Sequence, residues 1–468
     1  MKQYNRVKEY QKRLTKNVLL AEVTEKFSQK ISDIDSKEEV VQSVTNFVLA
    51  PALNGFVAWV LNEAMNKGMK RLYFLARDGY FMYQTAKVYV EEYGLPIECR
   101  YLYCSRYSIR VPNFHLDTGK ALDYITLGGL DVTAKKLYKR AGFNREQRRK
   151  MYEEQILPLE KEEQIPRERL PEIKELLREN KNFMEMLQEN SCKAFPKYEQ
   201  YLKQEGLLDE IPMALVDSGW VGSMQKELNL SLQKMGKKDS LKGFYWGLYE
   251  LPEKVERQNY DTYFFSPEGE MKRKAGFNNC LFESIFTAPH GMTLGYEEKD
   301  KEIRPILSKL NEQRRERLCL MEEIMEQWQT DFMKSAKGMP PSQVLEGLGG
   351  QEVLTIIERN LESFMHHPTK AEAGVFGELE FTDDVLEYAG NKIATKMEEK
   401  ELTQNHLVGR VWLELTGKKN HIQQSAWYEG SAVVYGKNPE YHIFHYSCYK
   451  YLMNYRKRER WRKQYGGN

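Results

Sequence analysis

Residues 214–223, ALVDSGWVGS, restrict the fold of this 468-residue chain more than any other segment. An apolar run ends in Asp217, two glycines follow within five residues, and Ser223 begins a helix-like pattern. In α/β proteins a turn of this kind lies at the carboxyl end of a strand, where glycine lets the backbone approach a ligand. The first free N–H groups of the next helix then face an anion. The segment predicts an anion pocket bordered by the Asp217 carboxylate.

An earlier part of the chain has the alternation that a parallel sheet requires. The apolar run 71–76 predicts a strand, 80–93 a helix that ends at Gly94, and 96–103 a second strand. Further strands are expected at 211–216, 241–249 and 262–265. Strands that alternate with helices predict an α/β fold with a doubly wound, mostly parallel (Rossmann-like) sheet.

Changes of composition divide the chain into three segments. We expect an N-terminal helical arm at 1–40, an α/β domain at 41–300, and a mainly helical C-terminal region at 301–468. Dense charge with helical spacing predicts a helical insertion at about 119–205 inside the second segment. Pro51 predicts a helix break within 41–68, and a long helix is expected at about 306–337.

Composition narrows the functional classes. The 70 Lys and Arg residues nearly balance the 68 Asp and Glu residues, which makes nucleic acid an unlikely partner. The N-terminus lacks the apolar core of a signal peptide, and no uninterrupted apolar run reaches the ~18 residues of a membrane span. The six cysteines are scattered and form no CxxC pair, which favours reduced thiols and a cytoplasmic location.

Three motifs fall where predicted strands end, so we expect them at one edge of the sheet. The first two are Arg77-Asp78-Gly79 and Ser105-Arg106, whose guanidinium groups suit phosphate. The third motif supplies Asp217, Ser218, Gly219, Trp220, Gly222 and Ser223. Structural roles are the alternatives: a turn ion pair at Arg77–Asp78, an Arg106–Asp217 pair that holds the sheet, or a helix cap at Asp217.

Residues 281–291 hold two further candidates. Glu283 lies in an apolar stretch, where burial raises the pKa of a carboxyl unless a cation compensates. His290, beside Gly291, is a candidate acid or base. The alternative is a helix end followed by a polar loop.

These motifs resemble a bacterial family identified as predicted hydrolases of the haloacid dehalogenase-like (HAD) superfamily. The matching segments are FLARDGY, YLYCSR, VDSGWVGSMQ and Glu283 followed by APHG, and the resemblance covers about residues 40–300. Genes of that family often lie beside glycosyltransferase genes in surface-polysaccharide clusters. The resemblance therefore implies a role in polysaccharide biosynthesis.

The chain departs from this family in one respect. A HAD phosphatase needs an apolar strand that ends in Asp-x-Asp, which supplies the nucleophile, the acid/base and Mg²⁺ ligands. Asp78-Gly79-Tyr80 lacks the second carboxylate, so the resemblance is to the domain that accompanies the catalytic one. Phosphoribosyltransferases are a weaker comparison, based on the spacing between Asp217 and Gly222-Ser223.

The sequence thus favours a cytosolic enzyme-like protein that binds a phosphorylated sugar or a nucleotide-linked substrate. Asp78, Asp217, Glu283 and His290 are its candidate catalytic residues, and Mg²⁺ is its candidate cofactor. The alternative is a non-catalytic scaffold or partner of glycosyltransferases, attached peripherally to the membrane by the basic aromatic residues 449–468.

Overall fold

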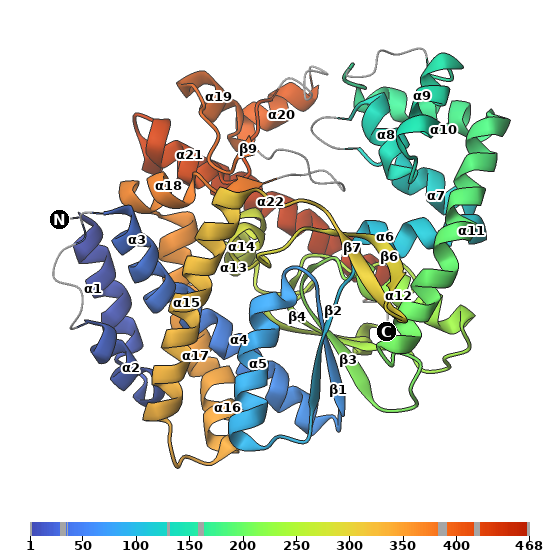
Figure 1. The fold of residues 1–468 in the computed structure, drawn as a ribbon. Helices are drawn as coiled ribbons and strands as arrows, with labels where there is room; N and C mark the ends of the chain where they lie inside the picture. The colour runs from blue at the N-terminus through green and yellow to red at the C-terminus, as the bar shows by residue number, and fades with distance from the viewer. Residues whose placement is uncertain are drawn as a thin grey trace.

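A computed structural model describes residues 2–28, 34, 36–128, 132–157, 163–381, 391–415 and 422–465 of the chain. Its centre is a five-stranded parallel sheet in the order β2-β1-β3-β4-β5 (Figure 1). The strands are β1 (Arg71–Leu75), β2 (Glu98–Leu102), β3 (Met213–Trp220), β4 (Lys242–Leu248) and β5 (Tyr260–Phe265). The prediction of an α/β fold with a parallel sheet is confirmed.

Side chains that alternate along the strands bury both faces of the sheet. Phe74 and Val216 belong to one hydrophobic cluster, together with α4 (Ala50–Asn66) and α5 (Gly79–Tyr93). Tyr73 and Leu215, one residue away in each strand, belong to another cluster with α11 (Lys181–Gln204) and α12 (Ser223–Lys234). Successive side chains of a strand point to opposite faces, so helices cover the sheet on both sides.

The predicted helix break at Pro51 is wrong. Helix α3 (Lys37–Val44), a π-helical turn at Thr45–Leu49 and α4 form one continuous helical run. Pro51, which has no N–H to donate, is the second residue of α4 and directly follows the wider π-helical turn, so the hydrogen-bonding pattern of the run changes at the proline without ending the helix. By length and composition alone this run could cross a membrane. However, 94% of its most apolar window is buried inside the fold, where it packs in the core.

The charged region after β2 forms a separate helical layer. It contains α6 (Arg106–Arg110), α7 (Thr118–Ile125), α8 (Ala134–Arg140), α9 (Arg145–Glu153), α10 (Leu170–Glu179) and the long α11. Helices α7 to α11 build their own hydrophobic cluster, which includes Leu137, Ile173 and Phe183. In Figure 1 these helices lie on the side of the molecule away from α1–α3.

The N-terminal helices share the main core with helices of the C-terminal region. Helices α1 (Lys2–Leu14) and α2 (Val18–Ser28) pack in the same cluster as α15 (Glu312–Ser335), α16 (Pro341–Gly349) and α17 (Gln351–Leu361). The long helix expected at 306–337 begins later, because 302–307 pairs with 293–299 as the antiparallel hairpin β6 (Thr293–Lys299) and β7 (Glu302–Leu307). Smaller elements complete the fold, followed by one long C-terminal helix, α22 (Pro439–Tyr465). The smaller elements are α13 (Met271–Gly276), α14 (Asn279–Ile285), α18 (Lys370–Phe376), β8 (Glu380–Phe381), β9 (Asn391–Lys392), α19 (Glu399–Gln404), α20 (Leu407–Leu415) and α21 (Tyr428–Tyr435).

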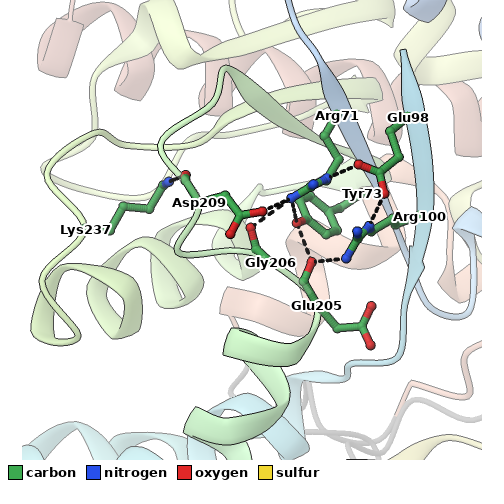
Figure 2. A network of polar contacts seen from close by, with 8 residues as sticks. All are labelled: Arg71, Tyr73, Glu98, Arg100, Glu205, Gly206, Asp209 and Lys237. Atoms are coloured by element: carbon green, nitrogen blue, oxygen red, sulfur yellow. Dashed lines mark hydrogen bonds and ion pairs between the residues drawn. The ribbon is translucent and has the colours of Figure 1, made fainter.

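A polar network fastens the helical layer to the amino-terminal edge of the sheet (Figure 2). The Arg71 guanidinium, at the start of β1, donates to Asp209 Oδ2 at 2.7 Å and to the Gly206 carbonyl at 3.1 Å. Its Nε lies 2.5 Å from Glu98 Oε2 at the start of β2. Arg71 thereby joins two strands to the turn after α11, at the edge of the sheet opposite to the predicted site.

Candidate functional site

The first predicted motif lies where expected, between β1 and α5. Gly79 begins α5, and a Cβ at this position would lie 3.0 Å from the carbonyl carbon of Phe74. Glycine therefore allows the helix to start close to the strand. The Asp78 carboxylate accepts a hydrogen bond from the Ser218 hydroxyl. This contact links the first motif to the third, in the crevice between neighbouring strands β1 and β3.

The third motif differs from the predicted loop, because β3 continues through Trp220. Gly219 and Trp220 pair with Gly247 and Leu248 of β4. Only residues 221 and 222 form a turn, and Gly222, with a φ of 70°, is the N-cap of α12. The sheet thus carries Asp217, Ser218 and Trp220 on rigid backbone. Helix α12 begins at Ser223 as predicted, and its N-terminus points its partial positive charge at the same edge.

The second motif begins α6. Ser105 caps this short helix by accepting from the Ser108 N–H at 3.0 Å, and its hydroxyl donates to the Thr293 carbonyl at 2.7 Å. The hydroxyl hydrogen is therefore directed at protein backbone, whereas the predicted role was donation to phosphate. Arg106, the next residue, is exposed at the mouth of the site.

These motifs line one cavity of about 230 Å³ at the carboxyl edge of the sheet. Ten of the thirteen predicted site residues are among its walls: Arg77, Asp78, Ser105, Arg106, Asp217, Ser218, Gly219, Trp220, Ser223 and Glu283. The strand order reverses between β1 and β3, and ligands of open α/β sheets bind at such a point. The three motifs lie close together because the parallel strands that the sequence predicted bring their carboxyl ends to the same edge of the sheet.

Three predicted residues are not among the described residues that line the cavity. Gly79 and Gly222 lie next to lining residues and shape the backbone. His290 packs against the rings of Tyr101 and Tyr103, and its Nε2 lies 2.8 Å from the Tyr101 hydroxyl. Its Nδ1 lies 2.8 Å from the Gly291 carbonyl oxygen. Burial lowers the pKa of His290, and the charge of Arg77 adds to this effect. With both ring nitrogens bonded, His290 supports the β2 edge and has no atom free toward the cavity.

Glu283 reaches the cavity from α14, and the Trp220 indole N–H donates to its carboxylate. Burial, together with the negative charge of Asp78, raises the pKa of Glu283 to about 8, and the charge of Arg106 limits this shift. Burial raises the pKa of Asp217 to about 7 in the same way, again with a contribution from Asp78. The cavity thus holds three interacting carboxyl groups, and the pKa values of two of them, Asp217 and Glu283, are raised well above the usual range of a carboxyl group.

Sequence reasoning missed the part of the wall that comes from the C-terminal region. Arg314, in the first turn of α15, adds a third guanidinium group, and Phe381 of β8 adds an aromatic ring. Neither residue follows a strand of the main sheet, so no motif marked them.

The donor groups of the cavity suit an anion that also carries hydroxyls. Arg77, Arg106 and Arg314 supply fork-shaped donors, and the start of α12 supplies further N–H groups. Carboxyl groups accept hydrogen bonds from hydroxyls or exchange protons with them. Among the described residues, no group of three or more His, Cys, Asp or Glu side chains is arranged to hold a metal ion, and a role for Mg²⁺ stays a prediction. No protein-family model and no curated protein matches this chain.

Proposed function

We propose that this chain is an enzyme-like protein that binds a phosphorylated sugar, free or linked to a nucleotide, in surface-polysaccharide biosynthesis. One observation carries the proposal: arginines and carboxyl groups from motifs far apart in the sequence line a single cavity at the carboxyl edge of the sheet. The polysaccharide context rests on the resemblance to the HAD-associated family. We also infer that the sheet is doubly wound and Rossmann-like, because helices cover both of its faces.

In this proposal the two kinds of charged side chain have separate tasks. Arg77 and Arg106 bind the phosphate, with the N-terminus of α12 beside them. Asp78, whose carboxylate is held by the Ser218 hydroxyl, accepts a proton or a hydroxyl hydrogen bond from the substrate. Glu283 and Asp217, whose raised pKa values favour the protonated form more than in an ordinary carboxyl group, donate protons to a leaving or bridging oxygen.

The arrangement does not support HAD phosphatase chemistry, in which an Asp-x-Asp pair acts on a phosphoryl group. Tyr80 occupies the position of the second carboxylate after Asp78. The acidic partners of Asp78 come instead from β3 and α14, and they face the cavity from the other strand and from a helix. The resemblance to the family therefore supports only the role in polysaccharide biosynthesis. The proposed chemistry depends on these three carboxyl groups.

Ligand-induced thermal stabilisation tests the proposal, because a ligand that binds only the folded state raises the melting temperature. The full chain is heated with hexose 1-phosphates, hexose 6-phosphates and nucleoside diphosphate sugars, each with and without Mg²⁺. We expect at least one to raise the melting temperature by several degrees, and Arg106→Gln to remove the shift. Arg149→Gln, whose side chain is 71% exposed on α9, is the matched control and should keep the shift. No shift with any member of the panel would count decisively against the proposal.

A further inference from the structure

Helix α22 is held against the body of the protein along one side. Lys450 Nζ donates to the Phe277 carbonyl at 2.9 Å and pairs with Glu429 Oε1 at 3.1 Å. Near the helix end, Lys457 pairs with Glu250 at 2.9 Å, and the Tyr465 hydroxyl donates to the Pro252 carbonyl at 2.7 Å. Residues 449–465 of the predicted tail are therefore the second half of a docked helix, and residues 466–468 lie outside the described part of the chain.

The outer side of α22 carries an aromatic stripe, defined as Tyr441, Phe444, Tyr451 and Tyr455. These side chains are 50%, 65%, 50% and 42% exposed, respectively. At roughly 100° per residue they fall within an arc of about 80°, so they share one face of the helix. Nine of the 17 exposed large apolar residues in the described part of the chain lie between Val408 and Tyr455. Exposed apolar groups that cluster in this way mark an interaction surface.

Helix α22 becomes cationic toward its end. Residues 456–463, RKRERWRK, contain six basic residues and one Glu. Arg456, Arg462 and Lys463 are exposed. Arg460 is also exposed, but it pairs with Glu250 at 3.5 Å on the docked side of the helix. Arg462 follows Phe444 by 18 residues, which is about five helical turns, so Arg462 continues the line of the aromatic stripe. At roughly 100° per residue, Lys463 and Arg456 lie about 40° and about 60° beyond the Tyr441 edge of the stripe, so they flank it. Because the whole chain has a net charge of only +2, this charge is a local feature.

We propose that the outer face of α22 lies on the anionic surface of a lipid bilayer. Aromatic rings with polar edges prefer the headgroup region, and exposed Lys and Arg side chains are attracted to anionic headgroups. From Tyr441 to Lys463 the face is roughly 33 Å long at 1.5 Å per residue, which suits a helix parallel to the membrane plane. A second copy of the chain with its helix parallel to this one would bring two cationic ends together, and an antiparallel dimer is one of the outcomes that the test below distinguishes.

The position of the cationic end connects this surface with the cavity. Glu250 and Pro252, which anchor that end, follow β4 directly at the carboxyl edge of the sheet. The cavity lies at the same edge. Docking through α22 would therefore bring the carboxyl edge of the sheet close to the lipid surface.

Vesicle sedimentation of the full-length protein tests the proposal. Vesicles of phosphatidylcholine alone are compared with vesicles that also contain phosphatidylglycerol. We expect binding only to the anionic vesicles, and weaker binding as salt is added. Replacing Arg456, Arg462 and Lys463 by Gln should weaken binding roughly a hundred-fold. The variant Tyr441→Ser, Phe444→Ser, Tyr451→Ser should weaken it about ten-fold or more, because the rings no longer enter the headgroup region.

Matched controls replace groups of the same kind on other surfaces. Lys181, Lys193 and Lys272, with side chains 86%, 70% and 81% exposed, are changed together to Gln. Val18, 81% exposed on α2, is changed to Ser. Both controls should bind vesicles as the wild type does. Failure of the wild type to sediment with anionic vesicles would overturn the proposal, as would equal losses in the control variants. A dimer that the stripe variant dissociates without vesicles, or tighter binding to a single-stranded oligonucleotide than to vesicles, would also overturn it.

Discussion

Ser218, near the end of β3, donates its hydroxyl hydrogen to the carboxylate of Asp78, which follows β1 and lies 140 positions earlier in the chain. This hydrogen bond crosses the crevice between the two strands at which the strand order reverses. It fixes one carboxylate of the cavity in place, and it connects two motifs that the sequence marked independently.

Loss of this hydrogen bond should cost stability. Ser218 is buried, so Ser218→Ala leaves the Asp78 carboxylate with one donor fewer, and we expect a loss of roughly 1–2 kcal/mol in the free energy of unfolding. Urea denaturation measures the change. Ser335→Ala is the control, because that hydroxyl donates only to the Asp331 carbonyl of its own helix and should cost less. Equal losses in the two variants would show that the Ser218–Asp78 contact adds nothing.

The raised pKa values of Asp217 and Glu283 should make the protein less stable as pH rises. Each carboxyl binds a proton more tightly in the folded than in the unfolded state. The resulting stabilisation is complete below the unfolded pKa of about 4. The free energy of unfolding then falls as pH rises toward the folded pKa values of about 7 and about 8. Asp217→Asn and Glu283→Gln remove the ionisation, and at pH 8 each should stabilise the fold by on the order of 2 kcal/mol. Chemical denaturation between pH 5 and pH 8, taken in roughly equal steps, checks this.

The prediction would be contradicted if the free energy of unfolding of the wild type did not change from acidic to mildly alkaline pH. Such a profile would mean that the two carboxyl groups ionise freely in the folded protein. A profile that falls with pH in both variants as steeply as in the wild type would assign the dependence to other groups.

Gly219 should tolerate no side chain. Its φ is 108°, and a Cβ would lie 2.6 Å from the Gly247 carbonyl oxygen in the neighbouring strand. Gly219→Ala therefore combines backbone strain with a clash against β4, and we expect a loss of roughly 3 kcal/mol or more. Gly236, with a φ of 98° and open space around its Cβ position, is the matched control. Gly236→Ala should cost only the backbone strain, about 1 kcal/mol, and thermal unfolding of both variants measures the difference.

Arg71 should be important for stability but not for ligand binding. Arg71→Met removes the donors to Asp209, Glu98 and the Gly206 carbonyl, and we expect a loss of roughly 2 kcal/mol, moderated because both carboxylates are partly exposed (Figure 2). Arg149→Met, on the exposed surface of α9, should cost about 0.5 kcal/mol or less. Denaturant unfolding gives both values. If Arg71→Met is folded without ligand but its melting temperature no longer rises when ligand is added, Arg71 would also be needed for ligand binding. That result would contradict the separation of these roles.

The sequence by itself determined the strands β1 to β5 and the motifs at the carboxyl ends of β1, β2 and β3. Apolar runs separated by helical segments predict parallel strands, and the carboxyl ends of parallel strands share one edge. For this reason Asp78, Arg106 and Asp217 could be placed near one another without any structure. The sequence could not show that β3 extends to Trp220, because Gly219 reads as a turn until its pairing with Gly247 is known.

Only the tertiary structure decided which distant groups complete the cavity. Glu283 enters it because α14 packs where the Trp220 indole can donate to its carboxylate, and Arg314 enters it from the first turn of α15. His290 is excluded because Tyr101 and the Gly291 carbonyl already bond its ring. Such contacts depend on how whole helices pack against the sheet. A local pattern of residues predicts where strands, turns and helices begin and end. It does not predict how distant helices pack against the sheet, and that packing sets these distances.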